Sequence, residues 1–275
     1  MRKDTHIHAM ILRQDVDSHA YVRAAIAKGL DTIAITDHMP LSCSSAGDRI
    51  PRGRVKEYCQ KVRELGRRYD GQIRILCGIE IDYHPSVKDE VDAILQEGDF
   101  DLRLGSSHLH VLHDAGWFKT VSRQDYARLM LENAAAAAQT GYFQVIPHID
   151  MYRWVFVNSR RFPCKDSVFN EQALLPYVRQ TLDAIKRNGV MLEINPHFAC
   201  GSGSMDDVYP SRLIAACALA SGVRFCYGSD AHRAEDVGAM LEQLEQNPLY
   251  GEALLRHSGE GTASIIQKTD GVSVF

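Results

Sequence analysis

Apolar and polar residues follow one recurring unit along this chain, an amphipathic helix, then a glycine, then a short apolar run. The unit is visible in YVRAAIAKGLDTIAIT, LMLENAAAAAQTGYFQVIPH, TLDAIKRNGVMLEINPH and LIAACALASGVRFCYGSDAH. Each helical part carries apolar residues at three-to-four spacing, which is typical of a helix with one buried face. Left-handed residues that end the helices are expected at Gly29, Gly141, Gly189 and Gly222.

The apolar runs predict about seven strands. They are nearly continuous and rich in Val, Ile and Phe, as in strands that are buried on both faces. Strand and helix alternate throughout, which implies parallel pairing with right-handed crossovers in an open sheet or a barrel. Helices are expected at residues 17–28, 54–69, 123–139, 171–188, 210–221 and 234–246, with a weaker one at 86–96. Residues 39–53 and 109–122 are expected to form long loops after strand ends.

Composition narrows the class of protein. The 275 residues are 45% hydrophobic and 24% charged, which is typical of a globular domain, and we expect residues 1–275 to form a single one. The net charge of −4 and the pI near 6.3 argue against a partner that is a nucleic-acid polymer. No apolar run approaches the roughly 18 to 20 residues that span a bilayer. No secretory signal follows Arg2 and Lys3, so a cytoplasmic location is expected.

Several common chemistries have no support in the sequence. The seven cysteines include no CxxC pair, which favours buried reduced thiols over a cysteine zinc site. The chain has no GxxxxGK[ST], GxGxxG or GxSxG motif, which argues against the usual nucleotide loops and a serine hydrolase. The stretch GSGS at 201–204 is expected to be a flexible loop.

Histidines and acids gather where the predicted strands end. The opening DTHIHA projects Asp4, His6 and His8 to one face, because side chains in a strand alternate with a period of two. Seven of the twelve histidines lie at or just after a strand end. The strand-end residues are His6, His8, Asp37, His38, Glu80, His108, His148, Glu193, His197, Asp230 and His232.

Such residues would meet at one face if the strands form a parallel barrel. Imidazole and carboxylate groups are ligands of zinc, manganese or iron, and the absence of thiolates favours a hydrolytic site over a structural one. At least six nitrogen and oxygen ligands exceed what one tetrahedral ion uses. Two or more divalent ions, bridged by a carboxylate such as Glu80, are therefore expected.

The motifs DTHIH, ITDH, GIEIDY, GSSH, IPHID, EIN and GSDAH resemble, in order and spacing, the polymerase and histidinol phosphatase (PHP) family. The resemblance covers residues 1 to about 245 and is strongest to the histidinol-phosphatase branch. It implies a distorted (β/α)7 barrel with parallel strands and up to three metal ions at its C-terminal face.

The resemblance also implies a set of metal ligands. The first ion would be held by His6, His8, Glu80 and Asp230, and Glu80 would bridge to a second ion at His108 and His148. His38 and His232 would belong to a third. Asp4 and Asp37 would orient the imidazoles.

The chain departs from the family pattern HxHxxxxxH at its start, because Gln14 stands where the third histidine is expected. The third ion site is then weaker, completed by Asp15 or another group, or empty.

The second departure concerns the substrate phosphate. The family usually offers an arginine after EIN, whereas this chain has EINPHFACGSG with His197. The expected substrate-binding residues are therefore Arg153, His197 and Arg160, the last of these next to Arg161.

These features predict metal-dependent hydrolysis of a small phosphate ester by a hydroxide that bridges the ions. Asp230 or His232 would pass a proton to the departing alkoxide. The resemblance implies L-histidinol phosphate as the substrate, with a nucleotide or a cyclic phosphodiester as the alternative.

Two other classes are disfavoured. Hydrolysis of a C–N bond by an amidohydrolase-type site often uses a lysine after the fourth strand, and here none occurs before Lys119. A non-catalytic accessory domain usually comes with lost ligands and fusion to a larger chain, neither of which is seen.

Overall fold

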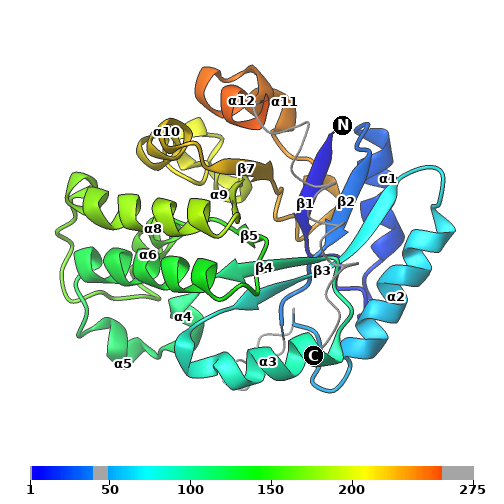
Figure 1. Ribbon diagram of the computed structural model, residues 1–275, viewed down its shortest axis with the longest axis horizontal. Coiled ribbons are helices and arrows are strands. Elements are labelled where there is room, and N and C mark those ends of the chain that lie inside the picture. Colours follow the sequence, from blue (N-terminus) through cyan, green and yellow to red (C-terminus); the bar gives the residue numbers. More distant parts are fainter. Residues whose placement is uncertain (1, 40–48, 256–275) are drawn as a thin grey trace.

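The computed structural model describes residues 2–39 and 49–255, and seven parallel strands form its centre (Figure 1). Each strand is hydrogen-bonded to the next in chain order, which confirms the predicted distorted (β/α)7 barrel. The strands are β1 (Lys3–Ile7), β2 (Thr32–Ile35), β3 (Arg74–Asp82), β4 (Leu102–Ser106), β5 (Val145–Ile146), β6 (Met191–Ile194) and β7 (Arg224–Tyr227).

Helices cover the outside of the strands (Figure 1). The main ones are α1 (Ser18–Ala27), α2 (Val55–Arg68), α3 (Lys88–Glu97), α6 (Arg123–Gln139), α8 (Leu175–Arg187), α10 (Arg212–Ser221), α11 (Leu241–Gln246) and α12 (Pro248–Leu255). Shorter ones follow strand ends: α4 (Leu109–Leu112), α5 (Ala115–Phe118), α7 (Tyr152–Val157) and α9 (His197–Ser202). The four predicted helix-ending glycines all have φ between 67° and 76°, as expected for the left-handed region.

The barrel is distorted at β3, which is nine residues long and serves two neighbours. Its first half pairs with β2 and its second half, from Gly78 onward, pairs with β4. A Cβ at Gly78 would lie 2.6 Å from Thr36 Cγ2 and 3.1 Å from the Ile35 carbonyl oxygen. Only glycine therefore lets β2 and β3 stay this close where their pairing ends.

The hydroxyl of Tyr58 lies at the same point. It is 2.9 Å from the carbonyl oxygen of Ile35 and 2.8 Å from that of Gly78, and it accepts a hydrogen bond from the Asp37 amide at 3.3 Å. Tyr58 is fully buried. One side chain from α2 thus lies within hydrogen-bond distance of three backbone groups at the point where β2 and β3 part.

Backbone hydrogen bonds join the first strand to the segment after the last one. The Asp230 amide donates to the His6 carbonyl at 2.8 Å, and the His8 amide donates to the Ala231 carbonyl at 2.9 Å. These bonds place the carboxyl ends of β1 and β7 side by side, although the two strands share no regular ladder.

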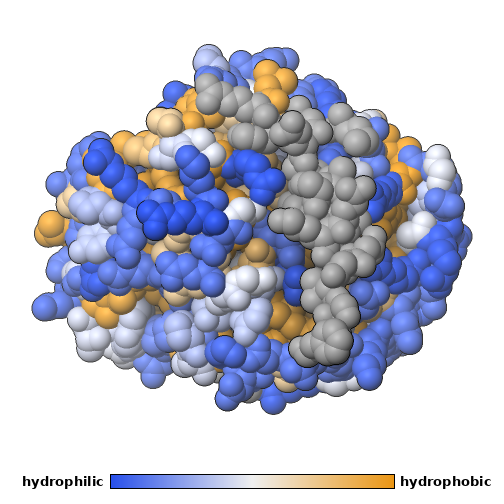
Figure 2. Space-filling model, in the orientation of Figure 1, coloured by the Kyte–Doolittle hydropathy of each residue, from blue (hydrophilic) through white to orange (hydrophobic). Residues whose placement is uncertain are grey.

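The core has two parts. A small apolar cluster from alternate strand positions includes Leu76, Leu104, Val145 and Met191, and a much larger one includes the apolar faces of the outer helices. Hydrophilic residues cover most of the face in Figure 2, and apolar residues gather there only in small groups. No helix in the described part of the chain is both long and apolar enough to cross a bilayer.

Three local predictions are wrong. The helix expected at 234–246 is broken, because Gly238 and Met240 have φ of 66° and 55° and the Gly238 amide donates to Asp4 at 2.9 Å. The loop expected at 109–122 contains α4 and α5, and helix α9 takes up part of the loop expected at 201–204.

The cysteine prediction holds in part. All six cysteines within the described residues are free, but only Cys59, Cys77 and Cys226 are buried, whereas Cys164 and Cys217 are half-buried and Cys200 is exposed. Cys43, most of the loop at 39–53 and the tail from residue 256 lie outside the described residues.

Replacing Tyr58 by Phe removes the shared hydroxyl and keeps the ring. We expect the free energy of unfolding to fall by about 1–3 kcal/mol, because buried carbonyl and amide groups lose a partner without access to water. Urea denaturation followed by circular dichroism measures this loss.

Tyr152→Phe is the matched control. Tyr152 is also fully buried, but its hydroxyl has no hydrogen-bond partner within the part of the chain that the structure describes. Its loss should be nearly neutral or stabilising. Equal destabilisation by both variants would contradict the role given to Tyr58.

Candidate metal centre

The fully buried carboxylate of Glu80, on β3, lies at the centre of the strand-end cluster. Five imidazoles surround it. The shortest distances from its oxygens to a ring nitrogen are 2.8 Å for His38, 3.0 Å for His148, 3.4 Å for His6 and His8, and 3.7 Å for His108. The structure therefore brings together strand-end residues from β1, β2, β3, β4 and β5, as the sequence predicts for a parallel barrel.

The negative charge of Glu80 and the positive charges of the histidines around it stabilise one another. Burial alone would raise the pKa of Glu80, but the positive charge of neighbouring histidines, His38 first, holds it well below its usual value. Burial would lower the pKa of His38, but the Glu80 carboxylate raises it to about 9. In the absence of an ion, protons on the imidazoles compensate the buried carboxylate.

A second carboxylate, Asp230, faces the two histidines of β1. Its Oδ1 lies 3.1 Å from His8 Nε2 and 3.7 Å from His6 Nε2. The same two ring nitrogens lie only 3.0 Å from each other. Burial would raise the pKa of Asp230, but the positive charge of His6 keeps it well below its usual value, so this carboxylate is ionised at neutral pH.

Outer carboxylates fix the tautomers of two histidines. His6 Nδ1 lies 2.7 Å from Glu193 Oε1, and His108 Nδ1 lies 2.6 Å from Asp82 Oδ1. Each carboxylate accepts the Nδ1 proton, so Nε2 faces the cluster and is the nitrogen that an ion would use once that nitrogen has lost its proton. Neither Glu193 nor Asp82 was predicted for this role. Asp82 could have been predicted from the alternation of side chains along a strand, because it projects to the same side of β3 as Glu80.

Two more residues hold these outer carboxylates. Arg49, only 7% exposed, places Nη2 2.5 Å from Asp82 Oδ2. The Asn195 side-chain amide donates to Glu193 at 2.9 Å and to Asp230 at 3.2 Å. No sequence motif pointed to Arg49, because it reaches the site from a loop.

Backbone strain marks the same centre. Among the described residues, four that are not glycine have positive φ, and two of them are His148 (25°) and Asp230 (55°). The left-handed region is unfavourable for residues with a Cβ, and such strain is concentrated at functional sites. Both residues turn the chain sharply at a strand end and direct their side chains into the cluster.

The role predicted for Asp4 and Asp37 is wrong. Asp4 accepts hydrogen bonds from the amides of Ser229 and Gly238, and Asp37 accepts them from the amides of Met10 and Ile11. These carboxylates hold loop backbone rather than imidazole rings.

The predicted substrate-binding residues lie at different distances from the cluster. The Arg153 guanidinium donates to the carbonyl oxygens of Val208, at 2.9 Å, and Asp206, and it stacks over Tyr209 at 5.5 Å. The Tyr209 ring is 6.4 Å from that of His148. Arg160 is exposed. His197 is also exposed, and its ring lies 5.3 Å from that of His232 at the edge of the cluster.

The donor set fits divalent cations. With Nδ1 of His6 bonded to Glu193, its Nε2 is the ring nitrogen that faces the cluster, and the buried Nε2 of His108 has no hydrogen-bond partner among the described residues. Five groups of three residues bring their ligand atoms within 4.8 Å of one another. They are His6–His8–Asp230, His6–Glu80–His148, His38–Asp82–His108, His8–His38–His232 and His197–Asp230–His232.

A parallel barrel with imidazole and carboxylate groups gathered at its C-terminal face is the architecture of a metal-dependent hydrolase. Comparison with known families identifies the group within this class. The PHP domain matches residues 4–197, and the chain belongs to that family.

Individual relatives agree with this assignment. The chain is 25% identical over 243 residues to a probable histidinol-phosphatase of Deinococcus radiodurans, covering 86% of this chain and 88% of the relative. It is 24% identical over 268 residues to the histidinol-phosphatase of Bacillus subtilis, covering 88% and 97%. Its fold is similar, with a TM-score of 0.68 and 18% identity, to the histidinol phosphate phosphatase of Lactococcus lactis solved with zinc, L-histidinol and phosphate, covering 99% and 94%.

Replacing Gly228 by Ala tests the outer carboxylate of His6. The new Cβ would lie 2.1 Å from Glu193 Oε1 and 2.6 Å from His6 Cβ, so Glu193 must leave its position. We expect Zn²⁺ affinity to fall about 10- to 100-fold, as for other losses of a carboxylate that orients a ligand. Competition with a chromophoric chelator measures the affinity.

The control for that variant is Gly66→Ala in α2, where the added Cβ meets nothing closer than 3.7 Å. It should leave the Zn²⁺ affinity unchanged. The interpretation of Glu193 would be refuted by wild-type affinity in G228A.

Ion uptake at pH 7 should release protons. His38, with a pKa of about 9, is protonated at pH 7 in the ion-free protein, whereas a metal ligand must offer a lone pair. Because pH 7 lies below this pKa, binding at His38 displaces a proton, and above pH 9 this residue releases none. Calorimetric titration with Zn²⁺ in buffers of different ionisation enthalpy counts the protons, and a heat independent of buffer at pH 7 would contradict the assignment.

Proposed function

We propose that this chain is a metal-dependent phosphomonoesterase, with L-histidinol phosphate as its first candidate substrate. The observation that carries the proposal is the buried Glu80 carboxylate among five imidazoles, in a chain of the PHP domain family. The names of the Deinococcus and Bacillus relatives support the substrate, as do the ligands of the Lactococcus structure.

We assign two to three divalent ions, Zn²⁺, Mn²⁺ or Fe²⁺, to the cluster. His6, His8, Glu80 and Asp230 would hold the first, and Glu80 would share a second with His108 and His148. A third would involve His38 and His232. When bound, such ions lower the pKa of water toward neutrality and compensate the charge of phosphate oxygens.

The protein's own groups would position the ester and handle its proton. Arg153 and Arg160 remain the candidates for charge-assisted hydrogen bonds to the phosphate. To bind phosphate, Arg153 must first release the carbonyl oxygens of Val208 and Asp206. Otherwise its role is to hold the segment that carries Tyr209, over whose ring it stacks.

The departing alkoxide needs a proton, because it is a poor leaving group without one. Asp230 is badly suited to supply it, since its low pKa keeps it ionised. His232, whose side chain is 33% exposed, is the better placed of the two predicted donors when it holds no ion.

Phosphate release from a panel of esters tests the proposal. Protein loaded with Mn²⁺, Zn²⁺ or Fe²⁺ would be assayed with L-histidinol phosphate, a nucleoside monophosphate and a cyclic phosphodiester. We expect the monoesters to be hydrolysed, and L-histidinol phosphate with the highest kcat/KM. Dominant turnover of the diester would exclude the proposed substrate class.

Glu80→Gln supplies the matched loss of function. Removing the central carboxylate should lower kcat about a thousandfold or more, since several kcal/mol of charge stabilisation by the ions is lost. The control is Glu57→Gln in α2, which removes a surface carboxylate paired with Arg54 and should keep full activity. An active E80Q enzyme would refute a catalytic role of the cluster.

A further inference from the structure

The ligand expected from position 14 does not belong to the cluster. Gln14 is exposed in a turn between β1 and α1. Its neighbour Asp15 is exposed too, and the Asp15 carboxylate accepts hydrogen bonds from the Arg13 guanidinium, one of them at 3.0 Å. Neither residue therefore completes a third ion site in this chain.

Another histidine lies beside the outer part of the cluster. The ligand atoms of His197, Asp230 and His232 lie within 4.8 Å of one another. Two imidazoles and one carboxylate are a donor set that Zn²⁺, Mn²⁺ and Fe²⁺ all accept. His197 comes from the start of α9, directly after β6.

The local bonding leaves these atoms available. His232 Nδ1 lies 3.0 Å from the Asp230 carbonyl oxygen and donates to it, which leaves the lone pair on Nε2. The imidazole of His197 is exposed, and no hydrogen bond joins it to another described side chain. The exposed ring of His197 can thus turn a nitrogen toward an ion, while the ring of His232 is already held by its bond to Asp230 and by stacking on His8 at 4.3 Å.

One side chain links the position of His197 to that of Asp230. The Asn195 oxygen accepts a hydrogen bond from the His197 amide at 2.8 Å, while its amide group donates to Asp230 at 3.2 Å. Asn195 is fully buried. The start of α9 is therefore held at a set distance from the carboxylate, which prepares the three groups for a common ligand.

We propose that His197, Asp230 and His232 hold a third divalent cation, with His197 replacing the ligand that position 14 does not supply. The inference rests on the proposed function in taking the two inner sites as filled, with Asp230 shared between the first ion and the third. It changes three earlier assignments: His197 binds the ion rather than the substrate alone, His232 keeps its place as a ligand and is no longer the proton donor, and His38 is no longer a ligand of the third ion.

Counting ions per chain tests the proposal. The purified full-length protein would be stripped, reloaded with Zn²⁺ or Mn²⁺, freed of excess ion by gel filtration and subjected to elemental analysis. We expect three ions in the wild type and two in both His197→Ala and His197→Gln. Chelator competition should show that these variants weaken ion binding at the third site. Loss of a residue that only orients a ligand costs about 10- to 100-fold in affinity, and we expect a larger loss here because a ligand itself is removed.

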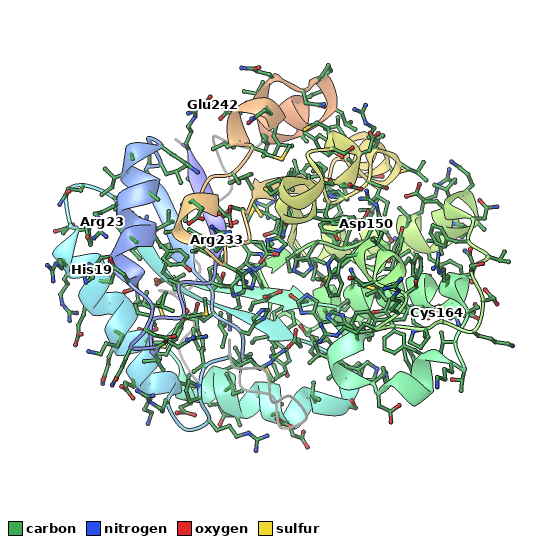
Figure 3. The ribbon with its side chains drawn as sticks, turned by 180° about the vertical axis from the view of Figure 1, so that it is seen from behind. His19, Arg23, Asp150, Cys164, Arg233 and Glu242 are labelled. Atoms are coloured by element: carbon green, nitrogen blue, oxygen red, sulfur yellow. The ribbon has the colours of Figure 1, made fainter. Side chains whose placement is uncertain are left out.

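His19→Ala is the matched control, since His19 lies on α1 at the edge of the molecule, far from its centre (Figure 3). It should keep three ions. Circular dichroism checks that the variants fold, which is expected because the His197 side chain is exposed.

Two results would overturn the proposal. The first is a wild type that holds only two ions. The second is a His197→Ala variant that keeps three, because the third ion would then lie in the alternative group His8–His38–His232. Phosphate release is measured on the same samples, so an inactive wild type would refute the proposed function while the ion count still decides the role of His197.

Discussion

The fully buried carboxylate of Glu80 is the group on which the arrangement of the whole centre depends. A buried charge costs several kcal/mol unless opposite charges and hydrogen bonds surround it. Glu80 meets this condition because five imidazoles from β1, β2, β4 and β5 turn toward it, together with the Ser106 hydroxyl. The barrel supplies the geometry, since only closure of the sheet brings these strand ends to within about one side-chain length of a common point.

Rigidity of the centre comes from a second layer of carboxylates. Glu193 and Asp82 each fix one imidazole, and Asn195 and Arg49 in turn fix these carboxylates. The imidazoles thus face the centre, the carboxylates lie behind them, and the Asn195 amide and the Arg49 guanidinium lie behind the carboxylates. Position 228 must be glycine for this layer to form, because Glu193 fills the space that a larger side chain would need.

The sequence predicted the barrel and the gathering of strand-end histidines and acids well, because both depend on simple periodicities. Strand and helix alternation predicts parallel pairing, and parallel pairing brings His6, Glu80, His108 and His148 to one face. Contacts between residues far apart in the chain could not be predicted from these periodicities. Asp4 points inward as predicted but meets backbone amides instead of an imidazole, and a bond from Gly238 to the same carboxylate breaks the helix expected at 234–246. A pattern indicates which side a group faces, not which neighbour it meets.

The join between β1 and β7 has a consequence for how the chain reaches its final state. His6 and His8 are synthesised early, and Asp230, the carboxylate that faces them, follows more than two hundred residues later. Contacts of such long sequence separation form late, because the entropy of closing the loop opposes them. The join between β1 and the segment after β7 therefore forms late, whereas β1 can pair with β2, its neighbour in the sequence, much earlier. His6, His8 and Asp230 therefore reach their final distances only once the two ends of the barrel have met.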